Sequence, residues 1–64
     1  MIKYDITFID DKTNRRFTYD DVLEMHFNVS RVIVKCRDHN GEYCNLAVFK
    51  SEYTRFLMEA IDEN

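Results

Sequence analysis

The sequence has no proline and only one glycine, Gly41, among its 64 residues. With so few positions at which a positive φ angle is free of steric penalty, the single glycine should mark a turn of fixed geometry. No apolar run approaches the roughly 18 residues of a membrane-spanning helix. The first residues alternate polar and apolar instead of forming the apolar core of a signal peptide, so we expect a soluble, cytoplasmic protein.

The chain also lacks the size and the charge of several functional classes. Its 64 residues make one domain at most, 1–64, with no room for a core plus a deep substrate cavity. Nine Lys and Arg against twelve Asp and Glu give a net charge of −3, so nucleic-acid binding would require a local basic face. Because the sequence has neither an activated nucleophile nor a phosphate-binding glycine loop, we expect no enzymatic activity and no cofactor.

The chain is instead rich in apolar residues (45%) and aromatic residues (14%), too rich for a disordered protein. Residues 2–9 alternate apolar and polar side chains, which predicts a half-buried strand. The alternation resumes over 15–19, and a four-residue turn over 11–14 would place Phe8 opposite Phe17. These two segments are therefore predicted to form an antiparallel hairpin.

The clearest unit is a second hairpin, formed by strands over 31–37 and 43–49. A three-residue loop over 39–41 brings the apolar residues of both strands onto one face, whereas a two-residue turn would put them on opposite faces. Asp38 and Gly41 occupy the first and fourth positions of this turn, as a type I turn followed by a bulge prefers. The register and the turn chemistry agree, and together they explain the single glycine.

Residues 19–27 fit two structures. As a strand over 22–27, they place Met25 and Phe27 on one face and extend the sheet of the second hairpin. As a helix, they would begin after Thr18, a good N-cap, with acidic residues in the first turn. We prefer the strand and keep the helix as the alternative.

The C-terminal segment 51–62 is predicted to be a helix. Ser51 would be its N-cap, and the apolar residues between Tyr53 and Ile61 recur at helical spacing. A helix of about twelve residues is marginal by itself and would have to pack on the sheet. The predicted fold class is therefore α+β: a small antiparallel sheet of about five strands, joined as a meander of hairpins, with one C-terminal helix packed on one face. The predicted strands are 2–9, 15–19, 22–27, 31–37 and 43–49.

Two cysteines and a histidine are the strongest candidates for chemistry. The spacing of Cys36, His39 and Cys44 is similar to the middle of a zinc knuckle, but a structural zinc ion needs four ligands and there is no second cysteine pair. The register makes the cysteines cross-strand neighbours with Cβ atoms about 4.5–5.5 Å apart, wider than the roughly 3.8 Å of a disulfide. We expect free thiols and no metal.

Two groups of surface residues are candidate partner-binding sites. Acidic turns could enter a basic groove on a nucleic-acid enzyme. These turns contain Asp10, Asp11, Asp20 and Asp21. The outer face of the predicted sheet mixes apolar and basic side chains, and small domains often use such a second face for a partner. That face contains Ile33, Lys35, Arg37, Tyr43 and Phe49.

These features favour a non-catalytic module that binds another protein. Small acidic proteins of this type are encoded by phages and mobile elements as inhibitors of CRISPR nucleases or of host enzymes, a likeness of class that rests on no motif. One alternative is a small nucleic-acid-binding or transcription-regulating protein that combines basic and aromatic side chains. Its binding residues would be Arg31, Lys35, Arg37 and Tyr43. A second alternative is a homodimeric structural subunit that uses the outer sheet face.

Overall fold

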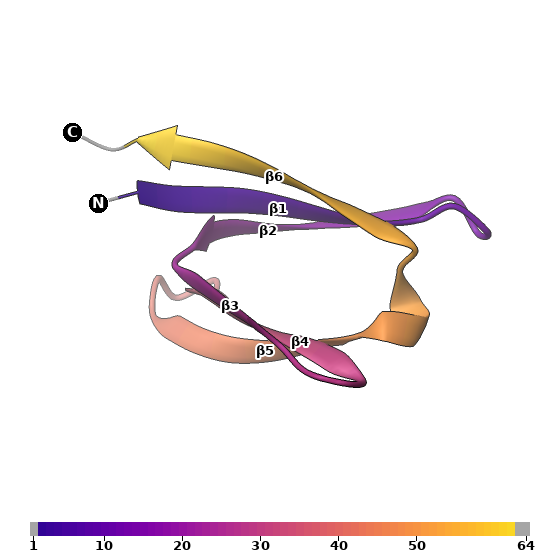
Figure 1. The fold of residues 1–64 in the computed structure, drawn as a ribbon. Coiled ribbons are helices and arrows are strands. Elements are labelled where there is room, and N and C mark those ends of the chain that lie inside the picture. The colour runs from indigo at the N-terminus through magenta and orange to yellow at the C-terminus, as the bar shows by residue number, and fades with distance from the viewer. Residues whose placement is uncertain (1, 63–64) are drawn as a thin grey trace.

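Six β-strands and one short 3₁₀ helix build residues 2–62, the part of the chain that the computed structural model describes. Sheet A has the strand order β2–β1–β6 and sheet B the order β3–β4–β5. The two sheets face each other as the layers of a sandwich (Figure 1). The strands are β1 (Ile2–Asp10), β2 (Arg15–Val22), β3 (Glu24–Phe27), β4 (Arg31–Arg37), β5 (Tyr43–Phe49) and β6 (Arg55–Asp62), and the 3₁₀ helix is η1 (Lys50–Glu52).

The first hairpin, β1–β2, has the predicted register, with Phe8 opposite Phe17. The strand β2 is longer than predicted because it continues past a bulge to Val22. At this bulge Asp21 has a φ angle of 55°, a conformation that aspartate tolerates better than most residues. The bulge turns the chain out of sheet A and towards sheet B.

The second hairpin, β4–β5, confirms the predicted register and turn. Cys36 lies opposite Cys44, and Gly41 has a φ angle of 83°. The Asp38 carboxylate accepts the backbone N–H of Asn40 at 2.9 Å, and the Asp38 carbonyl accepts the N–H of Gly41 at 3.0 Å. The turn is thus stabilised by its own polar residues, as its sequence indicates.

The segment 19–27 is a strand, and its helical alternative is not adopted. After a break at Leu23, β3 pairs with β4 so that Met25 lies opposite Val34 and Phe27 opposite Val32. Met25 and Phe27 thus share one face and extend the sheet of the second hairpin, as the strand interpretation predicted. The strand is shorter than predicted, however, because 22–27 is divided between two sheets.

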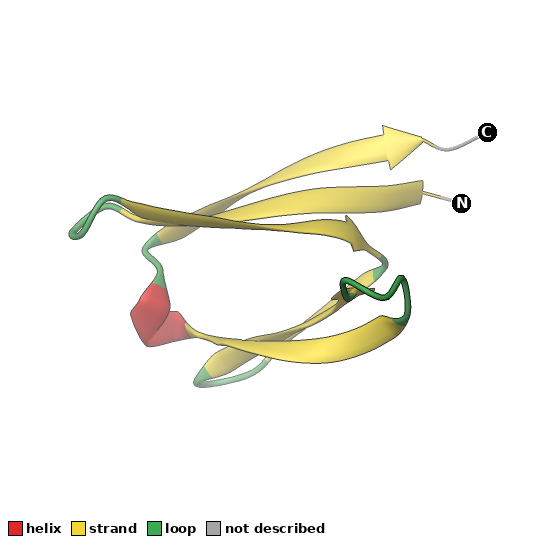
Figure 2. Ribbon diagram, turned by 180° about the vertical axis from the view of Figure 1, so that it is seen from behind, coloured by secondary structure: helices red, strands yellow, loops and turns green. Residues whose placement is uncertain are grey.

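The predicted helix over 51–62 is wrong, and with it the α+β class and the single five-stranded sheet. The described residues contain no α-helix, and thus none long and apolar enough to cross a membrane. The residues Arg55–Asp62 form β6, which pairs antiparallel with β1 (Figure 2). Ser51 is no helix N-cap: it lies within η1, which is tied by the Glu52 carboxylate accepting the N–H of Phe49 at 2.9 Å.

Two physical reasons favour the strand at the C-terminus. Part of this segment also fits a period of two: Phe56, Met58 and Ala60 share one face of a strand, while Leu57 and Ile61 fall on the other face. The second edge of β1 was also available, and pairing there satisfies the backbone over eight residue pairs, from Ile2 to Ile9 on β1. A short helix, which is only marginally stable by itself, would leave this edge of β1 without those backbone hydrogen bonds.

The core lies between the sheets and is centred on Phe8, which is fully buried. The ring of Phe8 contacts four other aromatic rings, with centroid distances from 4.8 Å to Tyr53 to 5.9 Å to Tyr19 and Phe56. Sheet A thus covers the apolar face of sheet B that the helix was predicted to cover. The buried core residues are Ile6, Phe8, Val22, Val32, Val34, Cys36 and Val48.

Candidate functional site: an apolar groove between β3 and β6

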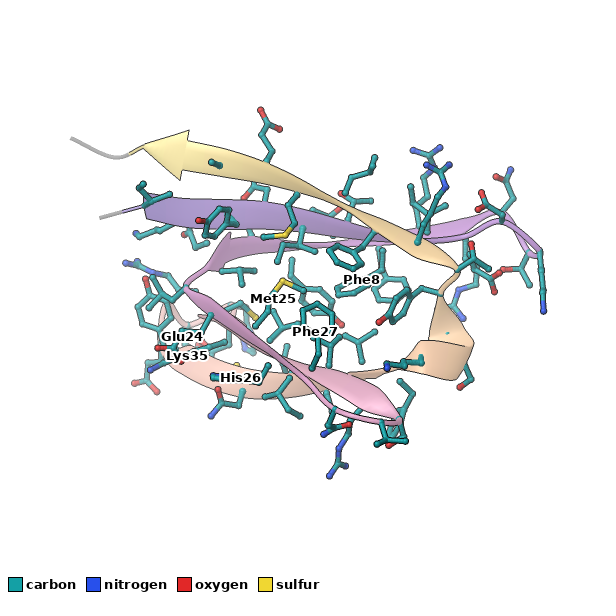
Figure 3. All side chains as sticks on the ribbon, in the orientation of Figure 1. Phe8, Glu24, Met25, His26, Phe27 and Lys35 are labelled. Atoms are coloured by element: carbon teal, nitrogen blue, oxygen red, sulfur yellow. The ribbon has the colours of Figure 1, made fainter. Side chains whose placement is uncertain are left out.

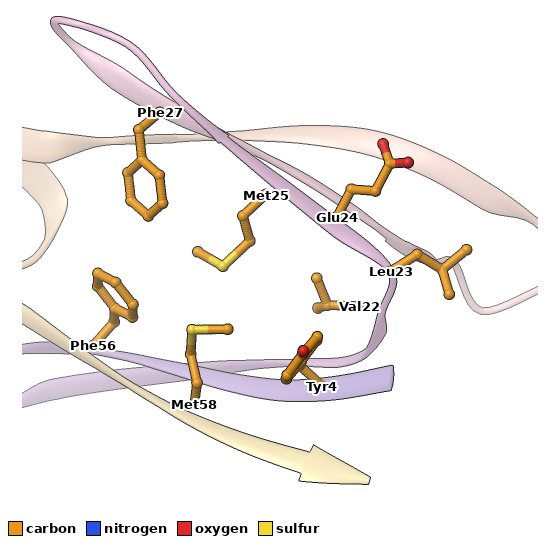
Figure 4. Close-up of a pocket in the computed structure, with 8 residues that line it drawn as sticks. All are labelled: Tyr4, Val22, Leu23, Glu24, Met25, Phe27, Phe56 and Met58. Carbon is orange, nitrogen blue, oxygen red and sulfur yellow. The ribbon is translucent and has the colours of Figure 1, made fainter. Parts of the chain in front are cut away.

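A groove with a volume of about 260 Å³ opens between β3 of sheet B and β6 of sheet A. Its walls are almost entirely apolar, and only one of the side chains that line it is charged (Figure 4). The lining residues are Tyr4, Val22, Leu23, Glu24, Met25, Phe27, Phe56 and Met58. Such a concave apolar surface is the usual form of a binding site.

Alternation along two strands places the groove side chains. Met25 and Phe27 point from β3 towards sheet A, and Phe56 and Met58 point back from β6 (Figures 3 and 4). The rings of Phe27 and Phe56 meet with centroids 5.8 Å apart. Phe27 is nevertheless 55% exposed and Met58 is 49% exposed, so large apolar side chains face solvent around the opening.

Both walls of the groove are edge strands. Within residues 2–62, β3 pairs with β4 alone and β6 pairs with β1 alone. The N–H of Asn28 donates to the carbonyl of Arg31 at 2.9 Å. Because bonded and non-bonded pairs alternate along an antiparallel ladder, the even-numbered residues of β3 bond to β4 and the odd-numbered residues do not. Met25 and Phe27 fall at the non-bonded positions of that ladder, so their backbone groups point away from β4 and towards the open edge.

The first predicted acidic pair lies at the β1–β2 turn and is used structurally. The Asp10 carboxylate accepts the N–H of Lys12 at 3.0 Å. Asp11 accepts the hydroxyl of Thr54 at 2.8 Å and lies 3.1 Å from Nε of Arg55. The hydrogen bonds from Thr54 and Arg55 lower the pKa of Asp11, and they tie this turn to the start of β6.

The second acidic pair lies at the opposite end of β2, where the chain passes to sheet B (Figure 1). Asp20 is exposed, whereas Asp21 is partly buried with its carboxylate 3.9 Å from Nε of Arg37. The structure therefore does not bring the two predicted acidic pairs together on one surface.

The predicted outer face exists on sheet B. The register places Ile33, Lys35 and Arg37 of β4 on the same side as Tyr43 and Phe49 of β5. Arg31, the fourth basic or aromatic residue of the nucleic-acid alternative, lies opposite Phe49. The guanidinium of Arg37 lies 5.0 Å from the centre of the Tyr43 ring.

The basic character of this outer face is partly offset by acidic neighbours. Glu24 lies opposite Lys35 on the same face, with its carboxylate 3.3 Å from Nε2 of His26. Arg37 has the carboxylate of Asp21 nearby, as described above. Because phosphate binding depends on a surplus of positive charge, these acidic neighbours weaken the outer face as a phosphate-binding surface.

The cysteine and histidine residues form no metal site in the structure. Cys36 is buried, Cys44 is half-buried opposite it, and both thiols are free. Burial raises the pKa of the Cys36 thiol, and the neighbouring Cys44 raises it further. His39 is exposed in the turn, and within residues 2–62 no three His, Cys, Asp or Glu side chains come together to hold a metal ion.

The groove was missed by sequence reasoning because one of its walls was predicted to be a helix. The signal that could have found it is the alternation of Phe56, Met58 and Ala60 with charged or exposed neighbours. Comparisons with protein-family models, with curated proteins and with solved structures found no match. The site is therefore interpreted from its own geometry.

Proposed function

We propose that this protein is a non-catalytic interaction module that binds an extended apolar segment of another protein in the groove between β3 and β6. The observation that carries the proposal is the set of large apolar side chains, Phe27 and Met58 above all, that remain exposed around a concave apolar surface. Soluble domains rarely leave such a surface contiguous and open unless it meets a partner.

The strand edges beside the groove favour an extended segment over a helix. A peptide added alongside an edge strand gains main-chain hydrogen bonds, while its alternate side chains enter a pocket. The backbone groups of Met25 and Phe27 face this edge, and the side chains of the same residues line the groove. Specificity would come from the apolar side chains that the groove accepts.

Two methionines make the groove adaptable. Met25 and Met58 line it from opposite walls (Figure 4). Because methionine is unbranched and its sulfur is polarisable, it can repack around apolar side chains of different shape. We therefore propose that the groove selects a partner segment by its apolar character and its extended conformation more than by one exact side chain.

The proposal includes a cytoplasmic location, where the free thiols of Cys36 and Cys44 would stay reduced. Inhibition of a nucleic-acid enzyme by the acidic turns stays a prediction. Those turns lie at the two ends of β2, so a partner would have to contact them separately.

A library of random peptides displayed on phage, selected on the immobilised full-length protein, tests the proposed function. Selected peptides are synthesised, and their affinity is measured by calorimetry for the wild type, for Met58→Arg and for Leu57→Arg. Leu57 is the matched control, because it is 53% exposed on the same strand but lies on the opposite face. We expect Met58→Arg to weaken binding at least about tenfold. The guanidinium would either lose its hydration when the peptide binds or occupy the space that the peptide side chain needs.

Leu57→Arg should bind the selected peptides nearly as well as the wild type. Circular dichroism checks that both variants are folded, and amide chemical shifts on peptide addition should change at β3 and β6. The proposal is wrong if no extended apolar peptide is selected, or if Met58→Arg and Leu57→Arg bind equally well.

A further inference from the structure

The strand β5 forms the other edge of sheet B, away from the groove, and its residues Tyr43–Phe49 include no charged side chain (Figure 2). Leu46 and Phe49 on this strand are 39% and 47% exposed. An exposed, uncharged edge is a template for pairing with another strand, and proteins usually block such edges with charges, bulges or short strands.

The remaining edges are less suited to a long pairing between two copies of the chain. The strand β6 carries Arg55 and Glu59, β2 is interrupted by the bulge at Asp21, and β3 has four residues. Of the edges within residues 2–62, β5 is therefore the one that offers a second copy of the chain a long, uncharged strand, whereas the short edge of β3 offers a peptide the backbone groups of Met25 and Phe27.

The hydrogen-bond pattern shows which backbone groups of β5 face this edge. At the two ends of the β4–β5 ladder, the N–H of Asp38 donates to Glu42 at 2.8 Å, and the N–H of Lys50 donates to Ser30 at 3.0 Å. The even-numbered residues of β5 therefore bond to β4. The odd-numbered residues direct their N–H and C=O groups away from β4, where an incoming antiparallel strand would meet them. These residues are Tyr43, Asn45, Ala47 and Phe49, and the N–H of Phe49 already donates to the Glu52 carboxylate at 2.9 Å. The incoming strand would therefore bond to the backbone groups of Tyr43, Asn45 and Ala47 and to the carbonyl of Phe49.

We infer that β5 pairs with β5 of a second copy of this chain, antiparallel about a two-fold axis at Leu46. This register places Glu42 opposite Lys50 of the second copy, and the symmetry repeats the ion pair at the other end. Tyr43 then lies opposite Phe49 of the second copy on the outer face, an aromatic pair of the kind that stabilises antiparallel sheets. Leu46 meets its own symmetry mate at the axis.

Charge selects this register over its neighbours. The two copies can also pair with one strand slipped by two residues, which keeps the inner faces of both sheets on the same side. Each such slip moves the symmetry axis by one residue along β5. An axis at Asn45 would place Glu42 opposite Val48 of the second copy, and an axis at Ala47 would place Glu42 opposite Glu52. Both shifts lose the attraction between Glu42 and Lys50, and the second replaces it with repulsion.

The dimer joins the two copies of sheet B into one continuous sheet and covers the exposed edge. Because β3 lies at the other edge of sheet B, the groove between β3 and β6 stays open in each copy. The dimer would thus present two grooves to a partner. This inference does not depend on the proposed function, since it rests on a different edge of the sheet.

Charge exchange at the ends of β5 tests the inference. The molar mass is measured by sedimentation equilibrium over concentrations that reach about 1 mM, because an interface formed by one strand pair is small and weak. We expect a concentration-dependent dimer for the wild type and a dissociation constant at least about tenfold larger for Glu42→Lys and for Lys50→Glu. The double variant Glu42→Lys/Lys50→Glu should restore the dimer, because it exchanges the charges in the same register.

Glu59→Lys on the edge strand β6 is the matched control, since it makes the same change of charge on an edge of sheet A, away from β5, and should leave the mass unchanged. A second measurement does not depend on charge: Leu46→Cys, at the two-fold axis, should form an intermolecular disulfide on mild oxidation, whereas Leu57→Cys should not. The inference is overturned by a wild type that stays monomeric throughout, by failure of the double variant to restore the dimer, or by the absence of the Leu46→Cys cross-link.

Discussion

Replacement of Phe8 by alanine is the change that should affect this fold most. The Phe8 side chain is completely buried, and its ring contacts the rings of Phe17, Tyr19, Tyr53 and Phe56 at centroid distances of 4.8–5.9 Å. These rings come from β2, β6 and the segment before β6, so Phe8→Ala leaves a cavity where sheet A meets the rest of the core. The neighbouring rings are held by strands and can collapse only partly into it.

The expected loss of stability is about 4 kcal/mol. Core Phe→Ala substitutions cost about 3–5 kcal/mol, and the four aromatic contacts favour the upper half of that range. A domain of this size is stable by about 3–10 kcal/mol, so the variant should lie close to its unfolding transition at room temperature. The milder change Phe8→Leu, which fills most of the volume but loses the ring contacts, should cost about 1–2 kcal/mol.

Urea unfolding followed by far-ultraviolet circular dichroism measures both changes at low micromolar concentration, where the monomer dominates. Phe49→Ala is the matched control, because Phe49 is 47% exposed on the outer face of sheet B and should cost under about 1 kcal/mol. The slope of the transition should be the same in all variants that remain folded. If Phe8→Ala lowers the free energy of unfolding no more than Phe49→Ala, the packing of sheet A over sheet B is wrong.

Two further predictions concern the turns. Gly41 has a φ angle of 83° and a Cβ added there would meet no atom within 4 Å, so Gly41→Ala should cost about 1–2 kcal/mol from backbone strain alone. Gly41→Asn should cost less in the same urea assay, and equal losses for both variants would argue against a left-handed backbone. The pKa of Asp11 is lowered in the folded state, so the ionised carboxylate stabilises the fold. This contribution is present above the unfolded pKa of about 3.9 and is lost as pH falls through the folded pKa. The stability difference between the wild type and Asp11→Asn should therefore be largest near neutral pH and shrink in acid, and a difference independent of pH would show that the carboxylate of Asp11 is not the cause.

Part of the candidate surface could be predicted from the sequence. The outer face with Lys35, Arg37 and Tyr43 follows from strand alternation and from the turn around Gly41, and the structure places these residues together as predicted. Asp10 and Asp11 lie at a turn as predicted, whereas Asp20 and Asp21 lie within β2 at its bulge, and the neighbours of both pairs were not predictable. Thr54 and Arg55, which bind Asp11, come from a segment more than forty residues away whose structure was predicted wrongly.

The sequence by itself determined the two hairpins, because their register depends on local alternation and on turn residues such as Asp38 and Gly41. Only the tertiary structure decided the C-terminal segment, since Phe56, Leu57, Ala60 and Ile61 would share one face of a helix, whereas Phe56, Met58 and Ala60 share one face of a strand. The deciding factor was the unpaired second edge of β1, a long-range partner that local propensity does not contain. The groove depends on the same decision: Met25 and Phe27 become the wall of a binding site only because β6 is the strand that faces them.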